Sequence, residues 1–202
     1  MDYLNDAILS YTAKYFSTED ANAIFKKLQT EIRYLPEGTT QIHLTDTIVH
    51  MPRQLAVYGT ELLKYKFNNH TLVVQNWTPI LNYLRRVADN IIQDTDKRHN
   101  FATVERYNNG LDMENGNITI EPTIDNTCPM ITFVFGARHP TIFKRPHQRK
   151  RFLSLTHGSM FKMKPTENTH RAIEIPKRSR TIQQTITVTF KRCNMPISNN
   201  NL

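Results

Sequence analysis

Residues 105–121 read ERYNNGLDMENGNITIE, and this stretch decides how we interpret the rest of the chain. Tyr107 leads into a polar turn that contains Gly110. The acidic Asp112 and a short run typical of a strand follow. Side chains two residues apart lie on one face of a strand, so Asn117 and Thr119 should share a face. A tyrosine, a glycine turn, an acidic residue and a short strand thus follow one another in this stretch.

The chain has 202 residues, of which 39% are hydrophobic, and this predicts one globular domain over residues 1–202. No apolar run approaches the roughly 18 residues of a membrane span, and the first ten residues are acidic. We expect a non-secreted protein of the cytoplasm or nucleus that has no contact with a membrane. Cys128 and Cys193 are too few for a disulfide framework and lack metal-site spacing, so both are expected to be buried thiols.

Charge is distributed unevenly along the chain. Residues 141–202 contain 13 Lys and Arg against two Glu, whereas residues 1–140 contain 13 basic and 16 acidic residues. A basic half suits a phosphate backbone, the acidic half of another copy of the chain, or simply a solvated face. The pattern leaves these three interpretations open.

Two amphipathic helices are predicted in the first half. Ser17 can cap a helix whose apolar residues keep helical spacing up to Ile32, and Glu19 suits its first turn. A second helix is expected to begin at Thr78 and Pro79. The β-rich runs QIHLTDTIVH, LLKYKF and TLVVQ lie between them.

From Phe101 onward the sequence alternates strands and turns, with the runs FATVERY, ITFVFGAR, FLSLTHGSMFKMK, AIEIPK and TITVTFKR. Helices followed by many short strands predict an α+β fold with a jelly-roll core and the N-terminal helices packed on its sheet. We expect an N-terminal α/β cap region at residues 1–100, the core at 101–192 and a tail at 193–202.

These segments together resemble the AlkB family of Fe(II)/2-oxoglutarate oxygenases, which remove alkyl groups from DNA and RNA bases. The family pattern runs N-R-Y-x-D-G-x-D-x-x-G-x-H-x-D-D-E, and residues 105–121 keep its frame. The order of motifs is also kept, namely PRQLAVYG (52–59), LKYKF (63–67), WTPIL (77–81), FGAR (135–138), LTHGSMFKM (155–163), NTH (168–170), IPK (175–177) and TITVTFK (185–191). The resemblance implies a double-stranded β-helix, nearest the eukaryotic DNA-repair members.

The resemblance places other residues at the family's iron-ligand positions. Asn117 and Thr119 stand where the family has His and Asp, and Ile173 stands at the position of the second His. Fe(II) in such oxygenases requires two imidazoles and a carboxylate on one face. The sequence therefore predicts a degenerate metal site, with no metal and no cofactor.

The cosubstrate positions differ as well. The family binds 2-oxoglutarate with two arginines six residues apart, and Thr185 and Lys191 occupy those positions. Glu105 replaces the family's Asn and adds a carboxylate that would repel an anionic ligand unless it is protonated. We thus expect no small-molecule substrate.

Several residues are candidates for binding nucleic acid or another partner. Arg53 and the aromatic Tyr65 and Phe67 occupy positions where the family contacts its substrate, and the latter two are equally explained as packing. The run KRPHQRKR predicts a basic loop between strands and supplies Lys144, Arg145, Arg149, Lys150 and Arg151.

Three hypotheses follow. The first is a catalytically inactive, self-assembling structural protein that forms homo-oligomers, such as a viral structural or occlusion-matrix protein inside a particle or crystalline inclusion. The second is a non-catalytic protein that binds nucleic acid, and the third is a divergent nucleic-acid dealkylase. The degenerate ligand positions favour the first hypothesis and predict that the chain is not an enzyme.

Overall fold

The computed structural model describes residues 3–5, 9–36, 41–44, 47–50, 53–60, 64–67, 70–92, 94–108, 115–118, 127–144, 150–163, 171–174 and 183–193. Its largest element is an antiparallel seven-stranded sheet. In spatial order the strands are β1 (Tyr3–Asn5), β2 (Leu9–Thr12), β13 (Ser159–Met163), β10 (Met130–Gly136), β15 (Thr185–Lys191), β8 (Phe101–Tyr107) and β5 (Gln54–Gly59).

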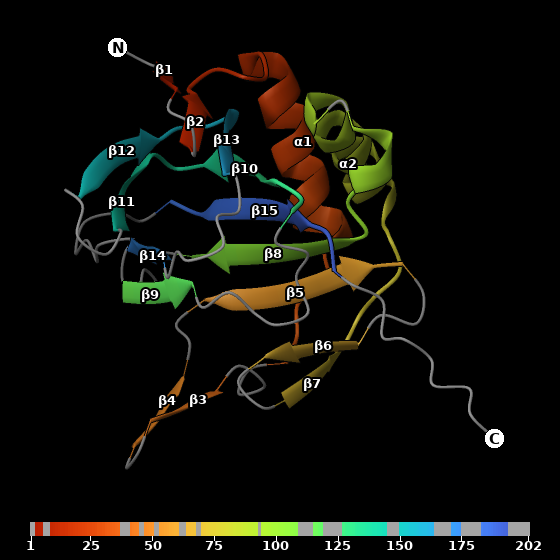
Figure 1. Ribbon diagram of the computed structural model, residues 1–202, viewed down its shortest axis with the longest axis vertical. Helices are drawn as coiled ribbons and strands as arrows, with labels where there is room; N and C mark the ends of the chain where they lie inside the picture. Colours follow the sequence, from red (N-terminus) through yellow and green to blue (C-terminus); the bar gives the residue numbers. More distant parts are fainter. Residues whose placement is uncertain are drawn as a thin grey trace.

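A four-stranded antiparallel sheet lies on one side of this large sheet, and two helices lie on the other (Figure 1). The smaller sheet has the order β12 (Arg151–Leu155), β11 (His139–Lys144), β14 (Arg171–Glu174) and β9 (Asn115–Ile118). Two hairpins complete the strands, β3 (Gln41–Leu44) with β4 (Thr47–His50) and β6 (Lys64–Phe67) with β7 (His70–Val73). The predicted α+β fold with a jelly-roll core is confirmed.

Both predicted helices are confirmed, and their ends follow the expected capping chemistry. Helix α1 (Thr18–Glu31) begins after Ser17, whose Oγ accepts a hydrogen bond from the Asp20 N–H at 3.0 Å. Helix α2 (Pro79–Ile92) has two capping acceptors, the Thr78 Oγ1, which accepts from the Leu81 N–H at 3.3 Å, and the Glu31 carboxylate of α1, which accepts from the Ile80 N–H at 2.9 Å. A 3-10 turn, η1 (Thr95–Lys97), follows α2.

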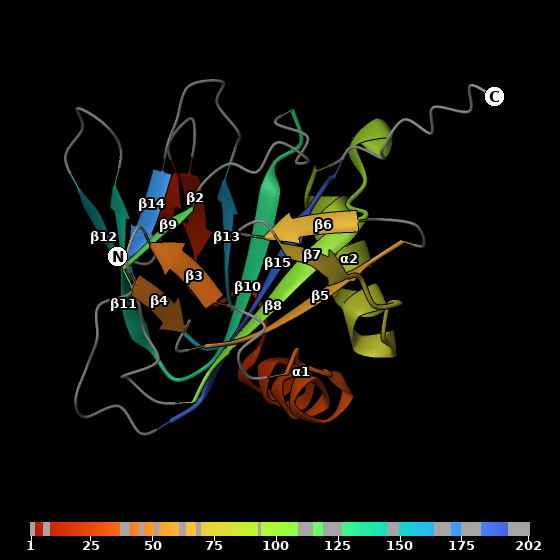
Figure 2. The same cartoon turned by 90° about the horizontal axis from the view of Figure 1, so that it is seen from below.

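The main core lies between the two helices and one face of the large sheet, as Figure 2 shows from below. Alternation along β15 sends Ile186, Val188 and Phe190 into this core, and β8 contributes Ala102 and Val104 in the same way. A second core cluster joins the opposite face of the large sheet to the smaller sheet through a set that includes Val134, Phe161 and Leu155. The large sheet is therefore covered on both faces.

One predicted run differs from the structure. FLSLTHGSMFKMK is divided between β12 and β13 by a turn, because Gly158 takes a φ of +73°, which other residues rarely adopt. In that turn the His157 Nδ1 accepts a hydrogen bond from the Gly136 N–H at 2.9 Å, which gives His157 a structural role. Both cysteines are buried thiols, as expected. Among the described residues, no helix reaches the length and hydropathy that a membrane crossing requires.

Candidate functional site

A polar row covers the face of the large sheet that is turned away from the helices. The pattern TITVTFK in β15 alternates, so its three threonines lie opposite the residues that enter the main core. The register places Thr187 beside Glu105 of β8 and Thr185 beside Tyr107. Strand sequence and strand pairing together therefore gather hydroxyls and one carboxylate on the inner face of the jelly roll.

Glu105 is the centre of this row. Arg53, directly before β5, donates from Nε to the Glu105 Oε1 at 3.0 Å, and the Tyr107 hydroxyl donates to Oε2 at 3.1 Å. The side chains of Arg53 and Glu105 are 14% and 27% exposed, so water screens this ion pair only in part. The pairing joins residues 52 positions apart in the sequence.

These contacts control the ionisation of Glu105. Burial alone would raise the pKa of its carboxyl, but the Arg53 charge, the Tyr107 hydrogen bond and the Lys191 charge outweigh burial, and the pKa lies below its ordinary value. The carboxylate is consequently charged at neutral pH, and Arg53 supplies the opposite charge beside it.

The two cosubstrate positions lie at opposite ends of β15. Thr185 is fully buried, and its Oγ1 donates to the Ala137 carbonyl at 3.1 Å. Lys191 pairs with Phe101 at the other end of the ladder. Six residues of strand separate the two positions by roughly 20 Å. Thr185 is thus part of the sheet's own hydrogen bonding, while Lys191 contributes a positive charge that acts on Glu105.

The iron-ligand positions fall in the smaller sheet. Asn117 in β9 pairs with Ala172 of β14, and Ile173 pairs with Gly116. Paired residues of an antiparallel ladder share a face, so Asn117 and Ile173 occupy positions of opposite parity. Thr119 lies outside the described residues. Within the described part of the chain, His, Cys, Asp and Glu side chains form no group of three that could hold a metal ion.

The predicted partner residues are described unevenly. Tyr65 and Phe67 lie in β6 at positions of the same parity, and their side chains are outside the described part. β11 ends at Lys144 and β12 begins at Arg151, whose side chains are likewise not described, and Arg145 and Arg149 lie outside the described residues. Lys150 is exposed directly before β12. Arg53 forms the ion pair with Glu105 described above.

Sequence reasoning missed the contacts of two residues near the site, Tyr107 and Arg106. It did not identify Tyr107 as a hydrogen-bond partner of Glu105, although residues i and i+2 of a strand lie on the same face. It also missed Arg106, which faces the opposite way: its guanidinium lies 4.1 Å from the centre of the Tyr34 ring, and its Nε donates to Gln54 at 2.5 Å. The second contact depends on the β5–β8 register, which no local pattern reveals.

Comparison with known proteins finds relatives that carry the same name in different mammals. No family model matches the chain. A mouse protein named DNA oxidative demethylase ALKBH2 is 30% identical over 186 residues, which cover 88% of this chain and 77% of that protein. The human protein of the same name is 27% identical over 192 residues, covering 91% and 72%.

Solved structures share the fold at low sequence identity. The structure of OsALKBH1 aligns with a TM-score of 0.58 at 10% identity, covering 94% of this chain and all of that one. An oxidoreductase of the 2OG-Fe(II) oxygenase family from Burkholderia pseudomallei gives 0.55 at 9% identity, covering 93% and 86%.

The names of these relatives contradict two of our predictions. The predictions of an inactive, self-assembling structural protein and of no enzymatic activity were both wrong, because the relatives at 27–30% identity are named DNA oxidative demethylases. Both predictions gave three ligand positions more weight than the remainder of the sequence, whereas the similarity to the demethylases extends along most of the chain.

Proposed function

The chain belongs to the AlkB family of Fe(II)/2-oxoglutarate oxygenases, and from that premise we propose that it is a divergent demethylase that acts on nucleic acid. One observation carries the proposal, the 30% identity to a DNA oxidative demethylase over 88% of this chain and 77% of the relative. Similarity of this breadth cannot come from a single shared motif.

The carried-over ligand positions do not fit the family's iron. Asn117 and Ile173 offer an amide and an aliphatic side chain, and their positions in the β9–β14 ladder have opposite parity. Two imidazoles and a carboxylate are therefore not supplied there. An active enzyme must take ligands at least in part from residues outside the described ranges, because the described ones contain no suitable group of three.

The cosubstrate positions do not fit a doubly charged anion in the family's manner either. Thr185 replaces one arginine and uses its hydroxyl within the sheet. Among the described residues, Lys191 and Arg53 are the positive charges that act on Glu105, and Glu105 already engages Arg53. A dicarboxylate would thus compete with Glu105 for its cationic partner, which predicts weak cosubstrate binding.

Nucleic acid is the proposed substrate class. The excess of basic residues after residue 140 supplies phosphate contacts, and in this proposal Lys144, Arg145, Arg149, Lys150 and Arg151 form that contact region. Arg53, Tyr65 and Phe67 are the proposed residues on the side of the modified base. Oxidative removal of a methyl group from a base is the proposed reaction.

The test is a demethylation assay on purified protein supplied with Fe(II), 2-oxoglutarate and oxygen. The substrate is an oligonucleotide with one methylated base, in single- and double-stranded form, and mass spectrometry measures the unmodified base and released formaldehyde. We expect turnover that a chelator abolishes and that requires an unusually high 2-oxoglutarate concentration. An intact methylated base in the presence of folded, metal-supplied protein that binds the oligonucleotide would contradict the proposal.

A further inference from the structure

Phe152 lies on the surface although nothing in the fold requires it there. Its side chain is 69% exposed, the largest value among the exposed large hydrophobic residues of the described chain. It belongs to β12, the edge strand of the four-stranded sheet, and pairs with Ile142 of β11. Exposure of an aromatic ring forgoes the stabilisation that burial would give, so this ring is available to an external partner.

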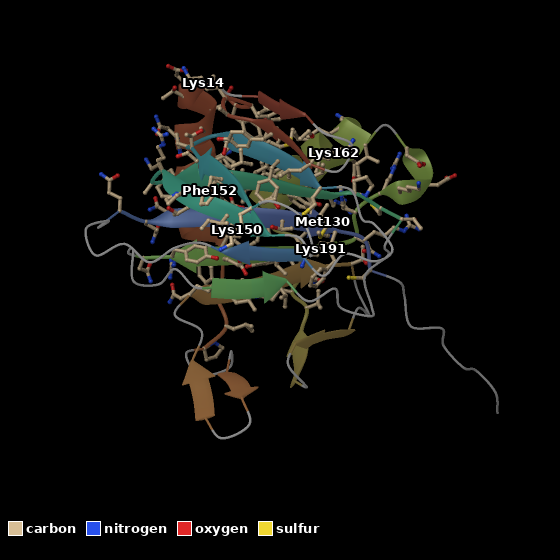
Figure 3. All side chains as sticks on the ribbon, turned by 60° about the vertical axis from the view of Figure 1, so that its left-hand side comes forward. Lys14, Met130, Lys150, Phe152, Lys162 and Lys191 are labelled. Atoms are coloured by element: carbon tan, nitrogen blue, oxygen red, sulfur yellow. The ribbon has the colours of Figure 1, made fainter. Side chains whose placement is uncertain are left out.

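Two cations flank this ring. Lys150 is exposed two residues before Phe152, and the exposed Arg138 donates from Nε to the Ser154 Oγ at 2.5 Å, two residues after it. Phe152 and Ser154 occupy positions of the same parity on β12, so the Arg138 guanidinium is held on the face that carries the ring. Figure 3 shows Phe152 and Lys150 on one side of the molecule. We call Arg138, Lys150 and Phe152 the β12 patch.

Most described carboxylates lie far from this patch, although the pairing of Phe152 with Ile142 and of Ile142 with Glu174 gives Glu174 a position of the same parity two strands away. Within the described side chains, six of the seven carboxylates belong to the helical side, at Glu19, Asp20, Glu31, Asp89, Asp94 and Asp96. The seventh, Glu105, is paired with Arg53 inside the jelly roll. The two cations of the β12 patch are therefore the groups that would attract a phosphate backbone.

We propose that the β12 patch docks a nucleic-acid strand with unpaired bases, outside the jelly-roll interior. One base stacks on the Phe152 ring, and its flanking phosphates contact Lys150 and Arg138. Alternate residues of a strand are about 7 Å apart, so a stacked base leaves those phosphates within reach of both cations. This inference rests on the proposed function for its partner class and adds a preference for single strands.

The combination of ring and cations favours nucleic acid over an acidic peptide. A polyanionic peptide would satisfy the two cations but would leave the ring in water. A nucleotide offers a phosphate and a flat π face together, and stacking on an aromatic side chain tolerates any base sequence. In a blunt duplex the bases are already stacked on one another, so the ring gains nothing there. The discriminating property is therefore unpaired bases, not charge alone.

Fluorescence anisotropy with unmodified, labelled oligonucleotides tests the inference. The probes are a 12-nucleotide oligo(dT) and a blunt duplex with no unpaired base. Phe152→Ala should weaken binding of oligo(dT) at least about fivefold and leave duplex binding almost unchanged, since one stacked base contributes about 1–3 kcal/mol. Phe152→Trp should retain the affinity. Tyr83→Ala is the matched control, because Tyr83 is an aromatic residue 43% exposed on α2 and should have no effect on either probe.

The cations are tested by their salt dependence. Lys150→Gln and Arg138→Gln should weaken both probes, and each should reduce the slope of log K against log salt by about one unit. Glutamine at position 138 can still donate to Ser154, so the change removes charge and keeps a local hydrogen bond. Unchanged slopes in both variants would overturn the assignment of phosphate contacts.

Two outcomes would overturn the inference as a whole. The first is an affinity of Phe152→Ala for oligo(dT) as high as that of Tyr83→Ala. The second is equal displacement of oligo(dT) by polyglutamate from the wild type and from Phe152→Ala. Failure of the proposed function has a different signature. A wild-type protein without turnover, whose oligo(dT) binding still depends on Phe152, refutes the demethylase and supports the patch. Turnover with oligo(dT) binding that is independent of Phe152 refutes the patch alone.

Discussion

Replacing Glu105 by Gln should destabilise the protein by about 2 kcal/mol, because it removes the partner of a largely buried guanidinium. The Arg53 Nε lies 3.0 Å from the Glu105 Oε1, and the two side chains are 14% and 27% exposed. At this distance and an effective dielectric constant near 20, Coulomb attraction is roughly 5 kcal/mol. Desolvation of both groups offsets much of this, and hydrogen bonds to charged groups contribute about 1.5–3 kcal/mol net.

The measurement is a double-mutant cycle by urea denaturation at pH 7, with wild type, Arg53→Met, Glu105→Gln and the double variant. Each single change leaves one member of the pair without its charge partner, whereas the double change removes both charges. The double variant should therefore be more stable than the two single losses predict, by about 1–2 kcal/mol. Tyr107→Phe is the control for the second hydrogen bond and should cost about 1 kcal/mol.

The same cycle has a pH dependence of definite sign. The pKa of Glu105 is lowered in the folded protein, so its stabilising contribution is complete above the ordinary carboxyl value of about 4.3. It is lost as the pH falls below that value and through the lower pKa of the folded state. Glu105→Gln should lack this part of the acid destabilisation. Additive losses in the cycle, with equal acid profiles for wild type and Glu105→Gln, would refute a stabilising ion pair.

Three further predictions concern the frame around the site. Gly136→Ala should cost at least about 2 kcal/mol in thermal unfolding, because φ at this position is +101° and an added Cβ would lie 2.2 Å from the Gln184 carbonyl oxygen. Burial lowers the pKa of His157, so the protein should lose stability in urea as the pH falls below about 6.5, and His157→Asn should remove that loss. Glu31→Ala should cost about 1 kcal/mol and weaken the amide protection of Ile80 in hydrogen exchange, because it removes the acceptor of the Ile80 N–H, while Thr78 continues to cap Leu81. An unchanged rate of exchange would show that water replaces the cap without loss.

Local chemistry made both helices and most strands predictable. Ser17 and Thr78 mark the starts of the two helices, because their side-chain oxygens cap the first turn. Alternation in TITVTFK distinguishes the residues that enter the core from those of the polar row. Strands β1 and β2 were not predicted, because YLN and LSYT are too short to show a clear period. β2 is held by pairing with β13, about 150 residues away in the sequence.

The candidate site was predictable only as a set of residue types at matched positions. The sequence placed Glu105 beside an anionic ligand, but it could not show that Arg53 neutralises it, because that contact depends on how β5 pairs with β8. The register of distant strands is set by packing of the whole sheet and not by any window of sequence. Phe152 was missed for a similar reason, since alternation in RFLSL does not say which face the smaller sheet turns to water.

The position of β15 between β8 and β10 determines when the protein can finish folding. β8 and β10 have both left the ribosome long before residues 185–191, yet each has one edge that only β15 can pair. During synthesis those two edges are open to incorrect partners, including other nascent chains. Pairing over such sequence distances is also slow, because loop closure precedes the contacts that stabilise it. A truncated chain that ends before Thr185 should therefore depend on chaperones, and release of β15 from the ribosome should coincide with the gain of protease resistance.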